Sequence, residues 1–262
     1  PLNGHLDPHK CRFIRMPRAN RIFCSGRVWH ITHRCHQREF LLKFARDRRR
    51  WRHWLFEARR RYGMSILNYI ATSNHVHLLC EDQGRGEIAL GLQLSAGRTA
   101  QEFNTRKNRK GAFWEDRYHA TAVQTDGHLA RCMTYIDLNM VRARVVRHPR
   151  DWEVCGYNEI QSPRPRKRVV DFEALMRLLN VDSHQTLVDL QNRLLQNEIS
   201  DSKRNPIWTQ SVAVGEREYL EEIKRNLGSR GTYRQVDNED RFRVLREPGH
   251  AYHAISCQKL RD

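Results

Sequence analysis

The stretch SILNYIATSNHVHLLCED, residues 65–82, predicts two strands joined by a tight turn. Apolar and β-branched residues lie on either side of Thr72–Asn74, a cluster of residues typical of turns. Side chains alternate along a strand, so His75 and His77 face the same side. This hairpin is the centre of the predicted fold and carries the chain's most suggestive polar pair.

The segments on either side alternate between strand and helix patterns. They are a strand in 27–35, a helix in 38–63 with Leu41, Phe44, Trp51, Trp54 and Leu55 at helical spacing, a helix in 86–111, a strand in 112–125, and a helix in 126–146 with Asp126 as its N-cap. The order β-α-β-β-α-β is the ferredoxin-like plan. It predicts an α+β fold: an antiparallel sheet with helices on one face.

Composition changes along the chain indicate four parts. Residues 1–26 form a basic, irregular arm, 27–160 hold the α+β domain, 161–170 (QSPRPRKRVV) form a basic linker, and 171–262 form a mainly helical extension. The sequence of the extension does not indicate its function.

Charge is the strongest compositional signal. The 262 residues carry a formal charge of +17, with only eight lysines among 47 basic residues. Arginine presents a planar fork that suits phosphate oxygens. A polyanionic partner is expected, above all a nucleic acid. A GC-rich genome could explain why arginine is more frequent than lysine, but not why the basic residues outnumber the 30 acidic residues.

Other compositional features narrow the class of protein. Seven scattered cysteines without a C-x-x-C pair argue against a disulfide framework and a structural zinc site. No apolar run approaches the length of a membrane span, and the first 20 residues lack the apolar core of a secretory signal. We expect a bacterial cytoplasmic protein associated with the nucleoid and no membrane partner.

The pair His75 and His77 has two possible interpretations. The two imidazoles of a strand His-x-His can reach one metal ion, but they can equally be incidental residues on a half-exposed strand. A second candidate lies in CMTYIDLNMV, where Tyr135 and Asn139 are four residues apart, on one helix face beside Arg131 and off the apolar stripe. A surface tyrosine is the plainer reading of that pattern.

Together, His75-Val76-His77, GAFWEDRYHATAV (111–123), TYIDLNMVRARVV (134–146) and HPRDWEVCGYNEI (148–160) resemble the single-tyrosine HUH transposases of bacterial insertion sequences. The REP-associated tyrosine transposases with a C-terminal extension are the most similar type. The resemblance spans about residues 26–160. Met140 departs from the proline that many members carry there.

The resemblance implies roles for four residues. His75, His77 and Asn139 would hold a divalent metal, Mg²⁺ or Mn²⁺, and Tyr135 would be the nucleophile. The implied reaction is attack on a DNA phosphodiester that gives a 5′-phosphotyrosine link and a free 3′-hydroxyl. The implied substrate is single-stranded DNA, with REP-like hairpins the expected form. In relatives the tyrosine helix serves its own active site or a partner's, so a homodimer and a monomer both remain open.

Tentative DNA contacts are aromatic or basic side chains near these motifs. They are Arg48, Arg49, Arg52, Trp114, Arg117, His119 and Arg131. The arginines of 38–63 can also form a merely solvated helix face, and Trp114 can belong to the core. Tyr118 is a weaker nucleophile candidate, and His30, His33 or His36 could add a ligand.

Three functions remain open from the sequence. The first is a metal-dependent enzyme that nicks and joins single-stranded DNA. The second is a hairpin-binding protein with weak or no cleavage. The third is an RNA-binding ferredoxin-like domain, which lacks the expected aromatic, glycine-flanked strand motif.

Overall fold

The predicted hairpin forms the centre of the sheet in the computed structural model. Strands β2 (Ser65–Ala71) and β3 (His75–Glu81) pair antiparallel, with a register shift between Ile66 and Asn68. The structure describes residues 26–115, 117–125, 127–163, 166–199, 205–239 and 242–246. The expected N-terminal arm, except residue 26, and the expected N-cap Asp126 lie outside these ranges.

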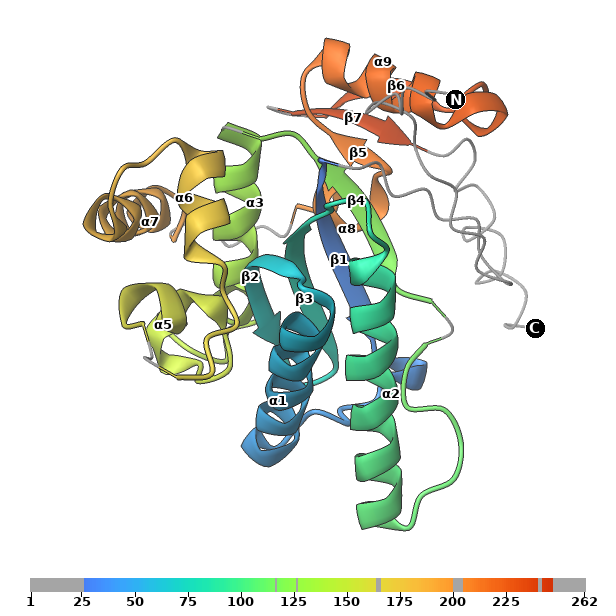
Figure 1. The fold of residues 1–262 in the computed structure, drawn as a ribbon, viewed down its shortest axis with the longest axis vertical. Helices are drawn as coiled ribbons and strands as arrows, with labels where there is room; N and C mark the ends of the chain where they lie inside the picture. The colour runs from blue at the N-terminus through green and yellow to red at the C-terminus, as the bar shows by residue number, and fades with distance from the viewer. Residues whose placement is uncertain are drawn as a thin grey trace, which may run out of the picture.

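Four strands build the predicted ferredoxin-like unit. Strand β1 (Val28–Arg34) lies between β3 and β4 (His119–Val123), antiparallel to both, which gives the order β2-β3-β1-β4. Helices α1 (Ala45–Tyr62) and α2 (Glu87–Lys107) pack together on one face of this sheet (Figure 1). The α+β fold class expected from the sequence is confirmed.

The other face of the sheet is covered by α3 (Gly127–Asp137) and by elements that follow it. The helix expected over 126–146 is interrupted: α3 ends at Asp137, Leu138 adopts φ −80° and ψ 2°, and α4 (Asn139–Arg142) follows. Buried apolar residues of α3, among them Leu129, Cys132 and Ile136, pack in the core. This break separates the two candidate site residues of the segment onto two short helices.

The C-terminal part both adds helices and lengthens the sheet. Its elements are α5 (Gly156–Gln161), α6 (Phe172–Leu179), α7 (His184–Glu198), α8 (Ile207–Gln210), β5 (Ala213–Val214), α9 (Arg217–Asn226), β6 (Gln235–Glu239) and β7 (Phe242–Arg246). Strand β5 runs parallel to β4, and β7 and β6 continue outward, so one seven-stranded sheet spans both parts (Figure 1). The extension is thus built onto the edge of the ferredoxin-like unit.

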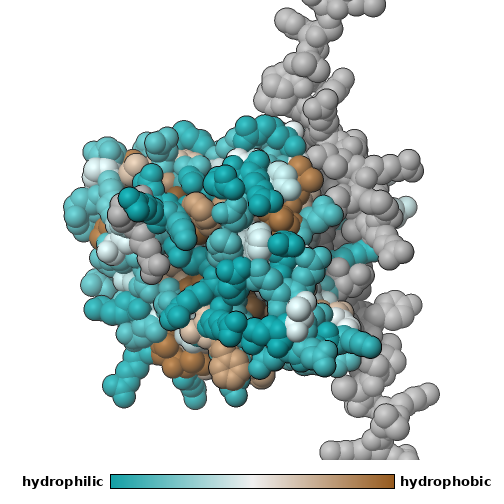
Figure 2. Space-filling model, turned by 60° about the horizontal axis from the view of Figure 1, so that its bottom comes forward, coloured by the Kyte–Doolittle hydropathy of each residue, from teal (hydrophilic) through white to brown (hydrophobic). Residues whose placement is uncertain are grey.

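The face of the molecule that Figure 2 draws is mainly hydrophilic. Figure 2 shows one face on which teal, hydrophilic residues surround a few brown hydrophobic clusters. Among the described helices, none is long and apolar enough to span a lipid bilayer.

Candidate active site

His75 and His77 project from the start of β3 on the face that α3 covers. Their ring centroids lie 4.8 Å apart and the ring planes are nearly perpendicular, at 84°. His77 is fully buried and His75 is partly buried. The strand alternation expected from the sequence therefore brings the two imidazoles together.

His30, on the neighbouring strand β1, orients the ring of His77. The two imidazoles stack with centroids 5.0 Å apart, and Nε2 of His30 lies 2.9 Å from Nδ1 of His77. On its other side, Nδ1 of His30 lies 2.7 Å from the carbonyl oxygen of Trp208. Burial lowers the pKa of His30 to about 4, so the ring is neutral at neutral pH.

This chain of hydrogen bonds defines a tautomer. A carbonyl oxygen can only accept, so Nδ1 of His30 carries the hydrogen and Nε2 of the same neutral ring accepts. Nδ1 of His77 must then donate to His30, with Thr32 Oγ1 also 3.1 Å away. The lone pair of His77 is consequently on Nε2, the nitrogen that points away from β1.

The same logic holds for His75. The Thr72 hydroxyl donates to the backbone carbonyl of His75 at 2.8 Å, which leaves the hydroxyl oxygen as an acceptor for His75 Nδ1 at 3.0 Å. The side-chain oxygen of Asn74 also lies 2.7 Å from that nitrogen. Both histidines thus use Nδ1 as a donor and keep the lone pair on Nε2, the arrangement typical of metal-ligating imidazoles.

Asn139 completes the set of donor atoms. Its carboxamide nitrogen lies 2.9 Å from Nε2 of His77, and a flip of the amide would present the oxygen instead. Neighbouring ligands of an octahedral ion with bonds of about 2.1 Å are about 3 Å apart. The spacing of Asn139 and His77 therefore matches that of two neighbouring ligands of a divalent ion, and the ring of His75 lies next to His77. The described residues contain no cluster of three His, Cys, Asp or Glu side chains that could bind a metal without an amide.

Tyr135 lies beside these imidazoles, not on the polar helix face expected from the sequence. Its side chain is 2% exposed, and its ring centroid lies 5.8 Å from that of His77 and 5.9 Å from that of His30. Among the described residues, its buried hydroxyl has no hydrogen-bond partner. The ring of Trp208, 6.3 Å away, and the guanidinium of Arg142, 5.5 Å from the ring centroid, also border it.

Asp137 anchors the break between Tyr135 and Asn139. This fully buried carboxylate accepts hydrogen bonds from the amide of Asn68 at 2.9 Å and of Gln191 at 2.8 Å. Burial raises the pKa of Asp137 to about 7, against the effect of both amides. Strand β2 and helix α7 thereby fix where α3 ends.

The three arginines proposed on α1 occupy different environments. Arg48 is only 8% exposed and donates to the carbonyl oxygens of Leu42 and Lys43, so its placement on a solvated face is wrong. Arg52 donates to Tyr69 and pairs with Glu159. Arg49 is exposed and pairs with Glu153. DNA contact by these side chains stays a prediction.

The other residues that were proposed to contact DNA also lie in different environments. Trp114 stacks on His33 and donates to the Ala96 carbonyl. His119 lies 3.0 Å from the Ser211 carbonyl, at the junction with the extension. Arg117 and Arg131 are exposed.

Tyr118, the alternative nucleophile, lies edge-on to His33 with 6.1 Å between centroids, and the structure brings it near His33 rather than His77. The sequence analysis named His30 as a possible additional ligand but did not predict that it orients His77. The only available signal was its place on a strand of alternating polar residues.

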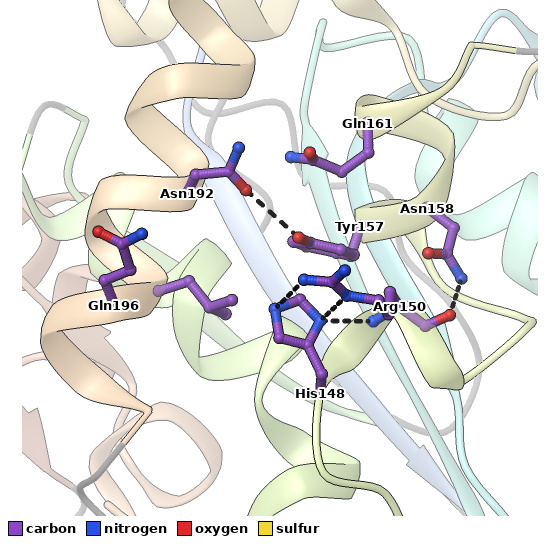
Figure 3. A pocket seen from close by; sticks show the side chains of 8 residues that line it. His148, Arg150, Tyr157, Asn158, Gln161, Asn192 and Gln196 are labelled. Atoms are coloured by element: carbon purple, nitrogen blue, oxygen red, sulfur yellow. Dashed lines mark hydrogen bonds between the residues drawn. The ribbon is translucent and has the colours of Figure 1, made fainter.

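A separate cavity of about 400 Å³ lies between α5 and α7 (Figure 3). In it the Tyr157 hydroxyl donates to Asn192, while Arg150 contacts His148. None of the sequence-predicted site residues lines this cavity. It is therefore distinct from the cluster around His77.

The fold thus brings paired imidazoles, a carboxamide and a helical tyrosine together at one ferredoxin-like sheet. Residues 25–139 match the sequence model of the family described as "Transposase IS200 like". Over these residues, which make up less than half of the chain, the sequence is similar to the IS200-like transposases. The matched range includes all four site residues and stops before the extension.

A search of curated proteins found no match. A solved structure described as "Structure of the REP associates tyrosine transposase bound to a REP hairpin" is 19% identical, with 61% of this chain and 96% of that chain aligned and a TM-score of 0.46.

Proposed function

We propose that this protein is a transposase that cleaves and rejoins single-stranded DNA through a covalent tyrosine intermediate. The observation that carries the proposal is the unpartnered, buried hydroxyl of Tyr135 beside an imidazole whose lone pair faces Asn139. A nucleophile, a metal-binding donor set and a basic protein are the parts that such a reaction needs.

In the proposed reaction, the phenolic oxygen of Tyr135 bonds to phosphorus and the bond to the 3′ oxygen breaks. The phenolic proton is lost and the departing 3′ oxygen gains one, so the products are a 5′-phosphotyrosine and a 3′-hydroxyl. Arg142, whose guanidinium lies over the phenol ring, favours the negative charge that develops there.

His75, His77 and Asn139 would hold a divalent ion, Mg²⁺ or Mn²⁺. When bound, this ion withdraws charge from the scissile phosphate and orients it. The protein's own contribution is to fix the acceptor nitrogens: Thr72 and Asn74 orient His75, and His30 orients His77.

The decisive test compares two tyrosine variants on a library of labelled single-stranded hairpins with Mn²⁺. Tyr135→Phe is expected to abolish covalent protein–DNA adducts on denaturing gels and to retain hairpin binding. Tyr118→Phe is the matched control and is expected to keep forming adducts. Adducts that persist in Tyr135→Phe would refute the nucleophile assignment.

A non-cleaving DNA hairpin-binding protein is the second candidate. The feature that favours it is the cover over the phenol, since Trp208 borders Tyr135 and the hydroxyl is inaccessible to solvent. Tight hairpin binding without adducts at any metal concentration would establish this alternative. A bacterial cytoplasmic, nucleoid-associated location follows from either DNA function and stays a prediction.

A further inference from the structure

The loop between β1 and α1 exposes two aromatic rings in a fixed position. Phe40 is 65% exposed and Phe44 is 59% exposed, although the sequence pattern places Phe44 among core residues. A phenylalanine has no polar atom to interact with water, so two exposed rings within five residues form an unusual surface.

The loop is held rigidly beneath these rings. Leu42, between them, is completely buried, and its backbone nitrogen donates to the carbonyl of Ser73 at 2.9 Å. The buried guanidinium of Arg48 binds the carbonyls of Leu42 and Lys43. The exposure of the rings is therefore built into the fold and does not come from a slack loop.

Positive charge lies close to the ring of Phe44. The ammonium groups of Lys43 and Lys107 lie 5.9 Å and 5.8 Å from the centroid of Phe44. Further exposed cations close in sequence to these lysines are Arg38, Arg46 and Lys110. Two acidic residues close in sequence to these rings already form ion pairs, Glu39 with Arg109 and Asp47 with Arg106.

The loop also adjoins the imidazole site. Its start and middle bind the turn before β3, because Cys35 donates to the Asn74 carbonyl at 2.8 Å and the Asn74 amide donates to the Arg38 carbonyl at 3.2 Å. The side chain of Asn74 in turn contacts His75. A strand bound at His75 is thus next to this loop.

We propose that Phe40 and Phe44, flanked by Lys43 and Lys107, form a stacking platform for unpaired bases of bound DNA. Flat aromatic rings accept any base, while the lysines bind the phosphates, which is the combination that recognises single strands. This inference rests on the proposed function and names where the strand lies outside the reacting phosphate.

The test measures binding in the full-length Tyr135→Phe protein without metal, so that cleavage cannot interfere. The probes are a single-stranded oligonucleotide containing 2-aminopurine and the fully paired duplex of the same sequence. Phe40→Ala and Phe44→Ala are each expected to weaken single-strand binding at least fivefold and to reduce the change in 2-aminopurine fluorescence. Duplex binding is expected to change less than twofold.

Three controls separate stacking from other effects. Phe44→Trp is expected to restore binding, since it keeps an aromatic face. Lys43→Gln is expected to lower the slope of log K against log salt by roughly one, which the Phe variants leave unchanged. Leu90→Ala removes another exposed apolar side chain, 45% exposed and near the opposite end of α2, and is expected to have no effect.

Three results would overturn the platform. Unchanged single-strand binding in both Phe variants, with adducts still formed by the wild-type protein, refutes the platform and leaves the proposed function intact. Unchanged DNA binding with a loss of self-association in sedimentation would assign the rings to a contact between two copies of the chain. A wild-type protein that binds no single strand refutes both proposals.

Discussion

The tautomer of His77 is set by a residue that touches no substrate. The Trp208 carbonyl accepts a hydrogen bond from Nδ1 of His30, so Nε2 of His30 is an acceptor. Nδ1 of His77 must therefore donate to it. Partners that orient a ligating histidine typically change metal affinity 10- to 100-fold when they are removed. His30 is therefore a positioning residue of this site.

We expect His30→Phe to weaken Mn²⁺ binding by about tenfold or more, because Nδ1 of His77 loses its acceptor. Electron paramagnetic resonance of free Mn²⁺ measures the affinity, and long-range ¹H–¹⁵N spectra of the metal-free protein report the tautomer of His77. His30→Gln should retain more affinity, since its carboxamide can accept and donate at once. Equal affinity in all three proteins would contradict the role of His30.

A second residue-scale prediction concerns Asp82, which lies after β3 and before α2. Burial and the nearby carboxylate of Glu87 raise the pKa of Asp82 to about 6 from 3.8. The folded state therefore holds this proton more tightly than the unfolded state. The stability that this group contributes is complete below about pH 3.8 and is lost as the pH rises through about 6.

Asp82→Asn is expected to remove that dependence, because asparagine keeps an acceptor for the Gly84 amide. Denaturant unfolding between pH 4 and pH 7 should show the wild-type protein losing about 2 kcal/mol relative to the variant, since one pKa unit corresponds to about 1.4 kcal/mol. Parallel stability curves would show that Asp82 does not titrate in this range.

Single residues also show how far sequence reasoning reaches. The spacing of His75 and His77 was sufficient to predict that they share a face, because strand alternation is a local property. The role of His30 could not be predicted, since it depends on β1 pairing with β3 and on a carbonyl 178 residues away. The burial of Tyr135 likewise depends on the distant Trp208.

At the scale of elements, α1 illustrates why charge patterns mislead. Its arginines have the same charge and similar spacing, yet Arg48 and Arg52 face buried acceptors while Arg49 lies in solvent. Helical periodicity locates a residue around the axis, but it does not reveal whether a neighbouring element covers that side. The expected basic face is therefore only partly a surface.

This difference predicts unequal effects on stability. Arg52→Ala should lower the free energy of unfolding by about 1–3 kcal/mol, because the buried carboxylate of Glu159 and the hydroxyl of Tyr69 lose a partner. Arg49→Ala, which removes an exposed pair with Glu153, should have a clearly smaller effect, because solvent screens that pair. Urea unfolding of both variants measures the difference, and a reversed order would refute these assignments.

Helix α3 shows a second limit of the sequence. The pattern in 126–146 is compatible with one continuous helix, but buried side chains set the break at Leu138: Asp137 is held by amides from β2 and α7. Both amide donors are distant in sequence. Asn139 and Tyr135 both lie at His77 on either side of this break.

At the scale of the whole molecule, the extension and the matched domain share one sheet. Backbone hydrogen bonds join β4 to β5 and its flanks, from Ala122 to Val212 at 2.9 Å and from Gln124 to Val214 at 3.0 Å. Composition indicated a separate C-terminal part beyond a linker. The shared sheet could not be predicted, because a sequence pattern does not show which edge strand a later strand joins.

Shared hydrogen bonds and core packing predict cooperative unfolding. We expect one transition, with the same midpoint by tryptophan fluorescence, far-ultraviolet circular dichroism and calorimetry. Trp208 in the extension and Trp51 in α1 should report together. Two resolved transitions would mean that residues 27–160 and 171–262 fold independently.

The place of Trp208 has a consequence for how a strand reaches the phenol. Its indole borders Tyr135, while its carbonyl is the acceptor for His30, so one residue both shields the nucleophile and aligns the imidazoles. In the proposed reaction, a phosphodiester must reach this buried phenolic oxygen, so part of its cover has to move. If Trp208 is the part that moves, the carbonyl bonded to His30 moves with it, and access to the phenol and alignment of the imidazoles would be coupled through α8.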